Sequence, residues 1–168
     1  MEYLTVGIAS LIGVVFASSA ASKLLDYSGF RRSLPQLAPV RPDLLGPLAV
    51  MVIAAEAAVP VLLLIPPAKA AGFGLSAGLL TAFSVAIAIA LRHGRRVPCR
   101  CFGSSRTPLG ASHLARNTIL LVLALAGELA AGGHLPPAGV AVAAAAGLLC
   151  AIPFVALDDI IYLFARSS

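Results

Sequence analysis

Two cysteines stand one residue apart in the most basic part of the chain, within the run PCRCFG at residues 98–103. The thiolate is the reactive and metal-binding form of cysteine, and nearby positive charge favours it. A disulfide between Cys99 and Cys101 would close a very small ring, and strained or exposed disulfides are the labile, more oxidising ones. We therefore predict thiol–disulfide chemistry at this pair. The arginines that supply the charge are Arg95, Arg96, Arg100 and Arg106.

The third thiol, Cys150, lies in an apolar run near the C-terminus and is a candidate resolving partner for the pair. A free cysteine is also often just a small hydrophobic residue. Two thiolates would suit Cu(I) or Zn as well, so soft-metal binding stays open as an alternative. No second cysteine pair exists, and His93 and His113 are the nearby imidazoles. We assign no metal ligand.

The elements that must position these cysteines are membrane helices. Hydrophobic residues make up 60% of the 168 residues, charged residues only 11%, and the mean hydropathy is +0.98. A soluble domain carries about 25% charged residues, so this chain has too little polar surface for water. Its net charge of +5 fits topology signals and anionic lipid, and no nucleic-acid motif is present.

Apolar runs of about 20 residues can cross a bilayer core of roughly 30 Å. The predicted fold is all-α, a polytopic membrane helix bundle of four to five transmembrane helices forming one domain over residues 1–168. The expected spans are residues 4–25, 44–65, 70–91, 114–131 and 138–157, followed by an amphipathic tail.

The first span is predicted to be retained, because the stretch before it carries Glu2 and no basic residue, unlike a secretory signal. Lys23 near its end is expected to extend to the membrane interface. The following loop, about residues 26–43, contains three prolines and is expected to be irregular.

Glu56 falls near the middle of the second span, four residues before Pro60. Proline excludes the helical hydrogen bond to the Glu56 carbonyl, so an acid and a weakened backbone coincide. Intramembrane acids are costly and usually serve relays or ligand sites. Glu56 is therefore a candidate proton relay or quinone-facing acid, expected to be neutral unless paired. The alternative is a structural acid that is hydrogen-bonded to a neighbouring helix.

Basic residues predict the orientation. Of twelve Lys and Arg residues, Lys69 alone falls on the side of the N-terminus, and the other eleven fall on the opposite side. The positive-inside rule places the N-terminus outside, and the cysteine loop and C-terminus in the cytoplasm.

Several of these residues together resemble the methylamine-utilisation MauE family, which is grouped with DoxX-like redox-associated membrane proteins. The resemblance covers about residues 4–125 and implies a bacterial plasma-membrane bundle that works with a thioredoxin-like partner during maturation of a disulfide-rich dehydrogenase subunit. Many members carry Gly where this chain has Arg100. The matching elements are Ser22-Lys23-Leu24, Phe30, Glu56, Cys99-Arg100-Cys101-Phe102-Gly103 and Arg116-Asn117.

The resulting hypothesis is a thiol-redox protein that passes electrons or disulfides between a thioredoxin-like partner and a membrane acceptor such as a quinone. Cys99 and Cys101 form the redox pair, Arg100 favours the thiolate, and Arg116-Asn117 order the loop. Phe102 and Lys23 complete the expected partner or substrate contacts. Two alternative hypotheses stay open. The protein could be a soft-metal transporter with the cysteines as entry ligands, or a non-catalytic assembly subunit. One conflict stays open, since stable disulfides are rare in the reducing cytoplasm.

Overall fold

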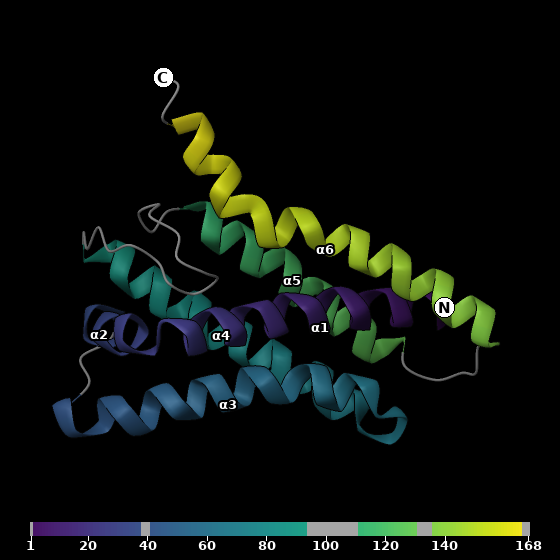
Figure 1. Ribbon diagram of the computed structural model, residues 1–168, viewed down its shortest axis with the longest axis horizontal. Helices are drawn as coiled ribbons and strands as arrows, with labels where there is room; N and C mark the ends of the chain where they lie inside the picture. The colour runs from purple at the N-terminus through teal and green to yellow at the C-terminus, as the bar shows by residue number, and fades with distance from the viewer. Residues whose placement is uncertain (1, 38–40, 94–110, 131–135, 166–168) are drawn as a thin grey trace.

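The computed structural model describes residues 2–37, 41–93, 111–130 and 136–165, and all regular structure within these ranges is helical (Figure 1). Side chains are described except at residues 36–37, 111 and 157–165. The all-α prediction is thereby confirmed. The helices are α1 (Glu2–Leu25), α2 (Tyr27–Leu37), α3 (Leu45–Leu64), α4 (Lys69–Arg92), α5 (Ala111–Leu129) and α6 (Pro137–Ala165), with short 3-10 turns at Pro42–Leu44 and Pro66–Ala68.

Four segments are long and apolar enough to cross a membrane: Glu2–Leu25, Pro42–Leu64, Pro66–Arg92 and Pro137–Ala156. These correspond to four of the five expected spans. The remaining one, α5, has 19 residues and begins with a polar stretch that includes His113, Arg116 and Asn117. At 1.5 Å per residue it is about 28 Å long, and it packs alongside α4 and α1.

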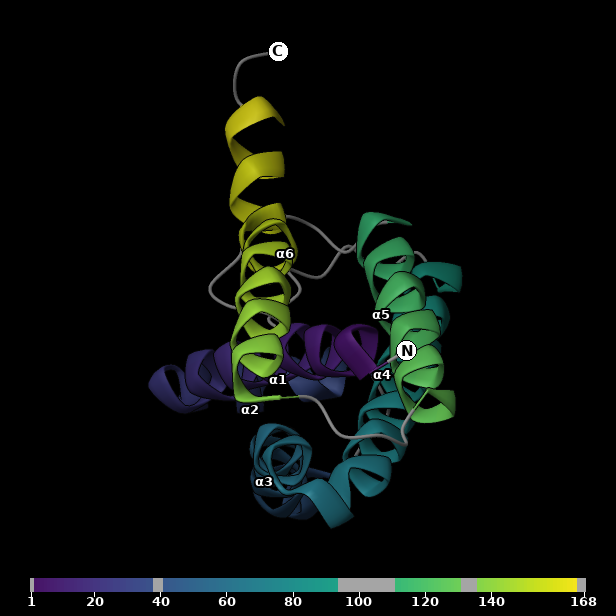
Figure 2. The same ribbon diagram turned by 90° about the vertical axis from the view of Figure 1, so that its right-hand side faces the viewer.

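The helix at the centre of the packing is α1, which contacts α2, α3, α5 and α6. Figure 2 shows it between α6 and α3, with α4 and α5 beside it on the right. Ile12, Val15 and Phe16 of α1 are fully buried, together with Phe73 and Leu80 of α4. Removing such side chains from contact with lipid brings no large hydrophobic gain, so close packing supplies the stabilisation.

Most of the segment between the first two spans is the helix Tyr27–Leu37, and for these residues the prediction of an irregular loop is wrong. Asp26 ends α1 and caps α2, because its carboxylate accepts hydrogen bonds from the Gly29 N–H at 3.0 Å and the Ser28 hydroxyl at 3.4 Å. Such capping compensates for the unpaired N–H groups of a helix start. Pro35 lies in the last turns of α2, where its missing N–H removes a single helical bond.

Amphipathicity also holds α2 in place. Phe30 and Leu34 are buried against Ala49 and Ile53 of α3, whereas Arg31 is exposed. Three prolines in the sequence predicted irregularity, but a cap and an apolar face were enough to form the helix.

The contact between α1 and α6 requires glycine. A Cβ placed on Gly147 would collide with the Gly7 carbonyl oxygen and lie 2.9 Å from its carbonyl carbon. Small residues allow two backbones to approach this closely in membrane helices.

We predict that Gly147→Ala destabilises the bundle by about 1–3 kcal/mol, because the added methyl forces α6 away from α1. The matched control is Gly78→Ala in α4, where a Cβ would meet nothing within 4 Å. That control should be neutral or slightly stabilising, since alanine is the better helix former. Thermal melting of both variants in one detergent tests this, and a Gly147→Ala protein that melts at or above the wild-type temperature would contradict it.

Candidate functional site

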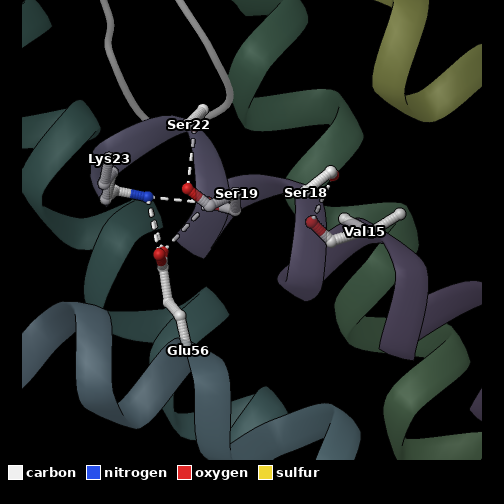
Figure 3. A network of polar contacts seen from close by, with 6 residues as sticks. All are labelled: Val15, Ser18, Ser19, Ser22, Lys23 and Glu56. Carbon is white, nitrogen blue, oxygen red and sulfur yellow. Dashed lines mark hydrogen bonds and ion pairs between the residues drawn. The ribbon is translucent and has the colours of Figure 1, made fainter. Parts of the chain in front are cut away.

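A buried ion pair joins α1 to α3. Lys23 Nζ lies 2.6 Å from Oε1 and 2.8 Å from Oε2 of Glu56 (Figure 3). The ammonium also donates to the Ser19 hydroxyl oxygen at 2.7 Å, and that hydroxyl donates to Glu56 Oε1 at 3.1 Å. Lys23 is 2% exposed, and Glu56 and Ser19 are 0% exposed. The three side chains form a closed polar network inside an apolar bundle.

Helical spacing explains how the network forms. Ser19 and Lys23 are four residues apart, so both lie on the same face of α1. On α3, the buried positions recur at helical spacing and include Glu56 between Ile53 and Val59. The acid thus belongs to the stripe of α3 that packs on α1.

The prediction that Lys23 extends to the interface is wrong, and the ion pair is the reason. A lysine at the end of a membrane helix can keep its ammonium in water by extending along the helix. Here the Glu56 carboxylate and the Ser19 hydroxyl provide three acceptor atoms inside the bundle. Turning inward then brings together two charges that would each be costly in isolation. Glu56 is therefore paired with Lys23. The sequence predicts a neutral Glu56 only if the acid has no such partner.

Two aromatic rings also lie near the ammonium. Lys23 Nζ is 5.4 Å from the ring centroid of Phe30 in α2 and 5.6 Å from that of Phe83 in α4. A cation within about 6 Å of an aromatic centroid is attracted by the ring quadrupole. Four helices, α1 to α4, therefore contribute to the surroundings of one charge.

A second group of buried polar side chains lies at the start of α5. His113, Arg116 and Asn117 are each at most 2% exposed. Arg116 Nη1 donates to the Phe154 carbonyl of α6 at 3.3 Å, whereas the Asn117 amide has no hydrogen-bond partner among the described residues. The predicted site residues Arg116 and Asn117 thus lie inside the bundle.

The two polar groups lie at a similar depth. The Thr5 hydroxyl donates to the Ala130 carbonyl at 3.0 Å, and a Cβ on Gly127 would lie 3.2 Å from Ile8. These contacts set α1 and α5 antiparallel, and an equal rise per residue then brings Asn117 to the level of Ser19. The positions of Asn117 and Ser19 in the sequence did not by themselves indicate that the two residues lie at the same level.

The predicted redox residues are only partly described. Cys99, Arg100, Cys101 and Phe102 fall within residues 94–110, outside the described ranges. Cys150 is described, and its free thiol lies on an exposed position of α6. Among the described side chains, no group of three or more His, Cys, Asp or Glu residues could hold a metal ion.

Ser19 and Phe83 were missed as site residues. A signal for Ser19 was present, because a serine four residues before Lys23 in an apolar helix marks one polar face. No comparable signal existed for Phe83, since one phenylalanine among many apolar residues of α4 is not distinctive.

We predict strong coupling between Lys23 and Glu56 in a double-mutant cycle. Lys23→Met and Glu56→Leu should each destabilise the protein by about 3–5 kcal/mol, because each leaves one buried charge without its partner. The double variant should lose much less than the sum, since neither charge remains. Thermal melting of the three proteins gives the coupling.

The exposed pair Arg41–Asp43, joined at 3.2 Å, is the matched control for this cycle. Arg41→Met, Asp43→Leu and the double variant should show little or no coupling, as is usual for surface ion pairs. Additive losses at Lys23 and Glu56 would contradict the buried pair.

Comparison with known proteins identifies the family of this chain. The model of the family described as "Methylamine utilisation protein MauE" matches residues 1–130, which include Lys23, Glu56, both cysteines of the pair and Asn117. Cys150 and α6 lie outside the match. No curated protein matches the chain significantly, and no solved structure does so either. Since the matched region exceeds three quarters of its length, the chain belongs to the MauE family of membrane proteins.

Proposed function

We propose that this protein is a membrane thiol–disulfide redox protein, in which Cys99 and Cys101 cycle between dithiol and disulfide. The observation that carries the proposal is the buried network of Ser19, Lys23 and Glu56. Ionisable residues inside a membrane bundle are expensive and commonly mark relays or substrate sites. Thiol oxidation releases protons, so a redox protein in a membrane needs a group of this kind.

Chain topology supports a connection between the network and the cysteines. Lys23 lies near the end of α1, and α4 ends at Arg92 while α5 begins at Ala111. These three helix ends lie at the same end of the bundle (Figure 1). The two described helix ends that flank the segment with Cys99 and Cys101 therefore lie at the end of the bundle where the ion pair is buried.

The chemistry of the pair suits proton exchange. Lys23 Nζ and Glu56 Oε1 are 2.6 Å apart in an apolar interior, where separated charges are disfavoured. Transfer of a proton from nitrogen to oxygen across this contact converts two charges into two neutral groups. This internal transfer exchanges no proton with the surroundings. We propose that the neutral Lys23 amine then accepts a proton released by thiol oxidation, and that the pair later gives this proton to the electron acceptor.

The proposed partners are a thioredoxin-like protein and a quinone. A dithiol of the thioredoxin-like partner would reduce the Cys99–Cys101 disulfide by exchange, which leaves the partner oxidised and returns Cys99 and Cys101 to thiols; the partner itself is what the resemblance implies. Oxidation of the two thiols to a disulfide releases two electrons and two protons, which a quinone takes up to become a quinol. Asn117 supports this acceptor, because its buried amide offers N–H donors and has no partner among the described residues. The family description further suggests that the exchange serves methylamine utilisation.

The first prediction of this proposal concerns the cysteine pair. Protein alkylated with and without prior reduction should yield Cys99–Cys101 peptides of different mass, because the oxidised form lacks both alkyl groups and also two hydrogens, the latter about two daltons. Adding a quinone to the reduced protein in detergent should increase the oxidised fraction. Cys150→Ser is the matched control and should leave this peptide's redox change intact. A pair that stays reduced with quinone present, and instead holds a stoichiometric metal ion, would overturn the proposal.

The second prediction separates proton exchange from stability. The double variant Lys23→Met/Glu56→Leu removes both charges and should fold, yet its quinone-dependent thiol oxidation should fall at least about a hundredfold, the low end of general acid–base contributions. The pH profile of the remaining rate should also change. Glu128→Gln, at an exposed position of α5, is the control and should behave as wild type. Full activity in the folded double variant would restrict the ion pair to a structural role.

A further inference from the structure

An apolar groove of about 410 Å³ runs along the outside of α1, between α3 and α6. Ala9, Gly13 and Ala17 form its floor on α1, Pro60 and Leu64 line one wall, and the other wall belongs to α6. The groove is independent of the ion pair, because its lining residues do not include Ser19, Lys23 or Glu56.

A single basic residue stands at the edge of this groove. Lys69, the first residue of α4, lines it together with apolar and small side chains and one serine, Ser10. The Lys69 side chain is half-buried, and among the described residues no carboxylate forms an ion pair with it. A cation thus lies beside an apolar channel without a described protein counter-charge.

The dimensions of the groove limit its occupant. Its lining on α1 extends from Val6 to Ala17, which at 1.5 Å per residue corresponds to about 16 Å. This is close to half of a bilayer core of roughly 30 Å, the depth of one leaflet. Apart from Ser10 and Lys69 the groove is lined by apolar or small residues, which suits a hydrocarbon chain.

Lys69 lies beside a helix turn at one end of the bundle. Lys69 follows the turn Pro66–Ala68 between α3 and α4, at the end of the bundle where α1 begins (Figure 1). Lysines near a membrane surface attract anionic lipid head groups. We propose that this groove is a binding site for one anionic phospholipid, whose acyl chain lies along α1 and whose phosphate contacts Lys69.

The site is tested with the full-length protein in nanodiscs of equal parts phosphatidylglycerol and phosphatidylcholine. Native mass spectrometry after release should find one retained phosphatidylglycerol per chain in preference to phosphatidylcholine. Lys69→Gln should reduce this preference about fivefold, the effect of one basic residue at the surface, and Lys69→Arg should preserve it. Arg92→Gln removes the same charge from the opposite end of α4 and is the matched control.

Acyl-chain binding is tested separately. Ala144→Phe fills the groove from α6 and should abolish retention of both lipids, whereas Ala146→Phe, at an exposed position of the same helix outside the groove, should retain them. Ala17→Leu provides a second obstruction from α1 in case Ala144→Phe fails to fold. The proposal is overturned by an unchanged lipid preference in Lys69→Gln, by full retention in both obstructed variants, by displacement of the lipid with free phosphate, or by a second copy of the chain bound in place of lipid.

Discussion

The cost of an isolated charge in an apolar interior is the constraint on which the centre of this structure depends. Neither the Lys23 ammonium nor the Glu56 carboxylate could be buried alone without a penalty of several kcal/mol. Together, at 2.6 Å and with the Ser19 hydroxyl as a third member, they are compensated. The pair therefore fixes the rotation of α1 and α3 about their axes, because either helix would expose a charge to apolar surroundings if it turned.

Two neighbouring helices place aromatic side chains near this ion pair. The Asp26 cap turns the chain from α1 into α2, and the turn brings Phe30 within 5.4 Å of the Lys23 ammonium. From α4, Phe83 approaches the same charge at 5.6 Å. Rings close to a cation replace part of its lost hydration. The short helix α2 thus completes a site that α1 and α3 begin.

The two ends of the bundle differ in chemistry. One end contains the ion pair, the buried start of α5 with its Asn117 amide, and the helix ends that flank the cysteine segment. Toward the other end, helices approach through small residues such as Gly7 and Gly147, and an apolar groove remains open beside Lys69. The buried polar residues and the apolar groove thus lie at different depths of the bundle.

Much about this protein could be predicted from composition and short motifs. Apolar runs of spanning length predicted the helices because the bilayer leaves backbone groups no partner except within a helix. The same runs made Glu56 conspicuous as an intramembrane acid, and the motifs around Lys23, Cys99 and Arg116 indicated the family. These properties depend on residues close together in the chain, so no knowledge of packing was needed to find them.

Only the tertiary structure decided where polar side chains point. Lys23 at a helix end could extend outward or turn inward, and the choice depended on Glu56, 33 residues away, lying on the facing side of α3. Likewise, the α2 helix formed despite Pro35 because α3 offered an apolar surface to Phe30 and Leu34. The level of Asn117 with Ser19 followed from the antiparallel packing of α5 on α1. Contacts between distant segments set the relative rotation and register of the helices. Apolar helices present similar surfaces all round, so the local sequence carries little information about this rotation and register.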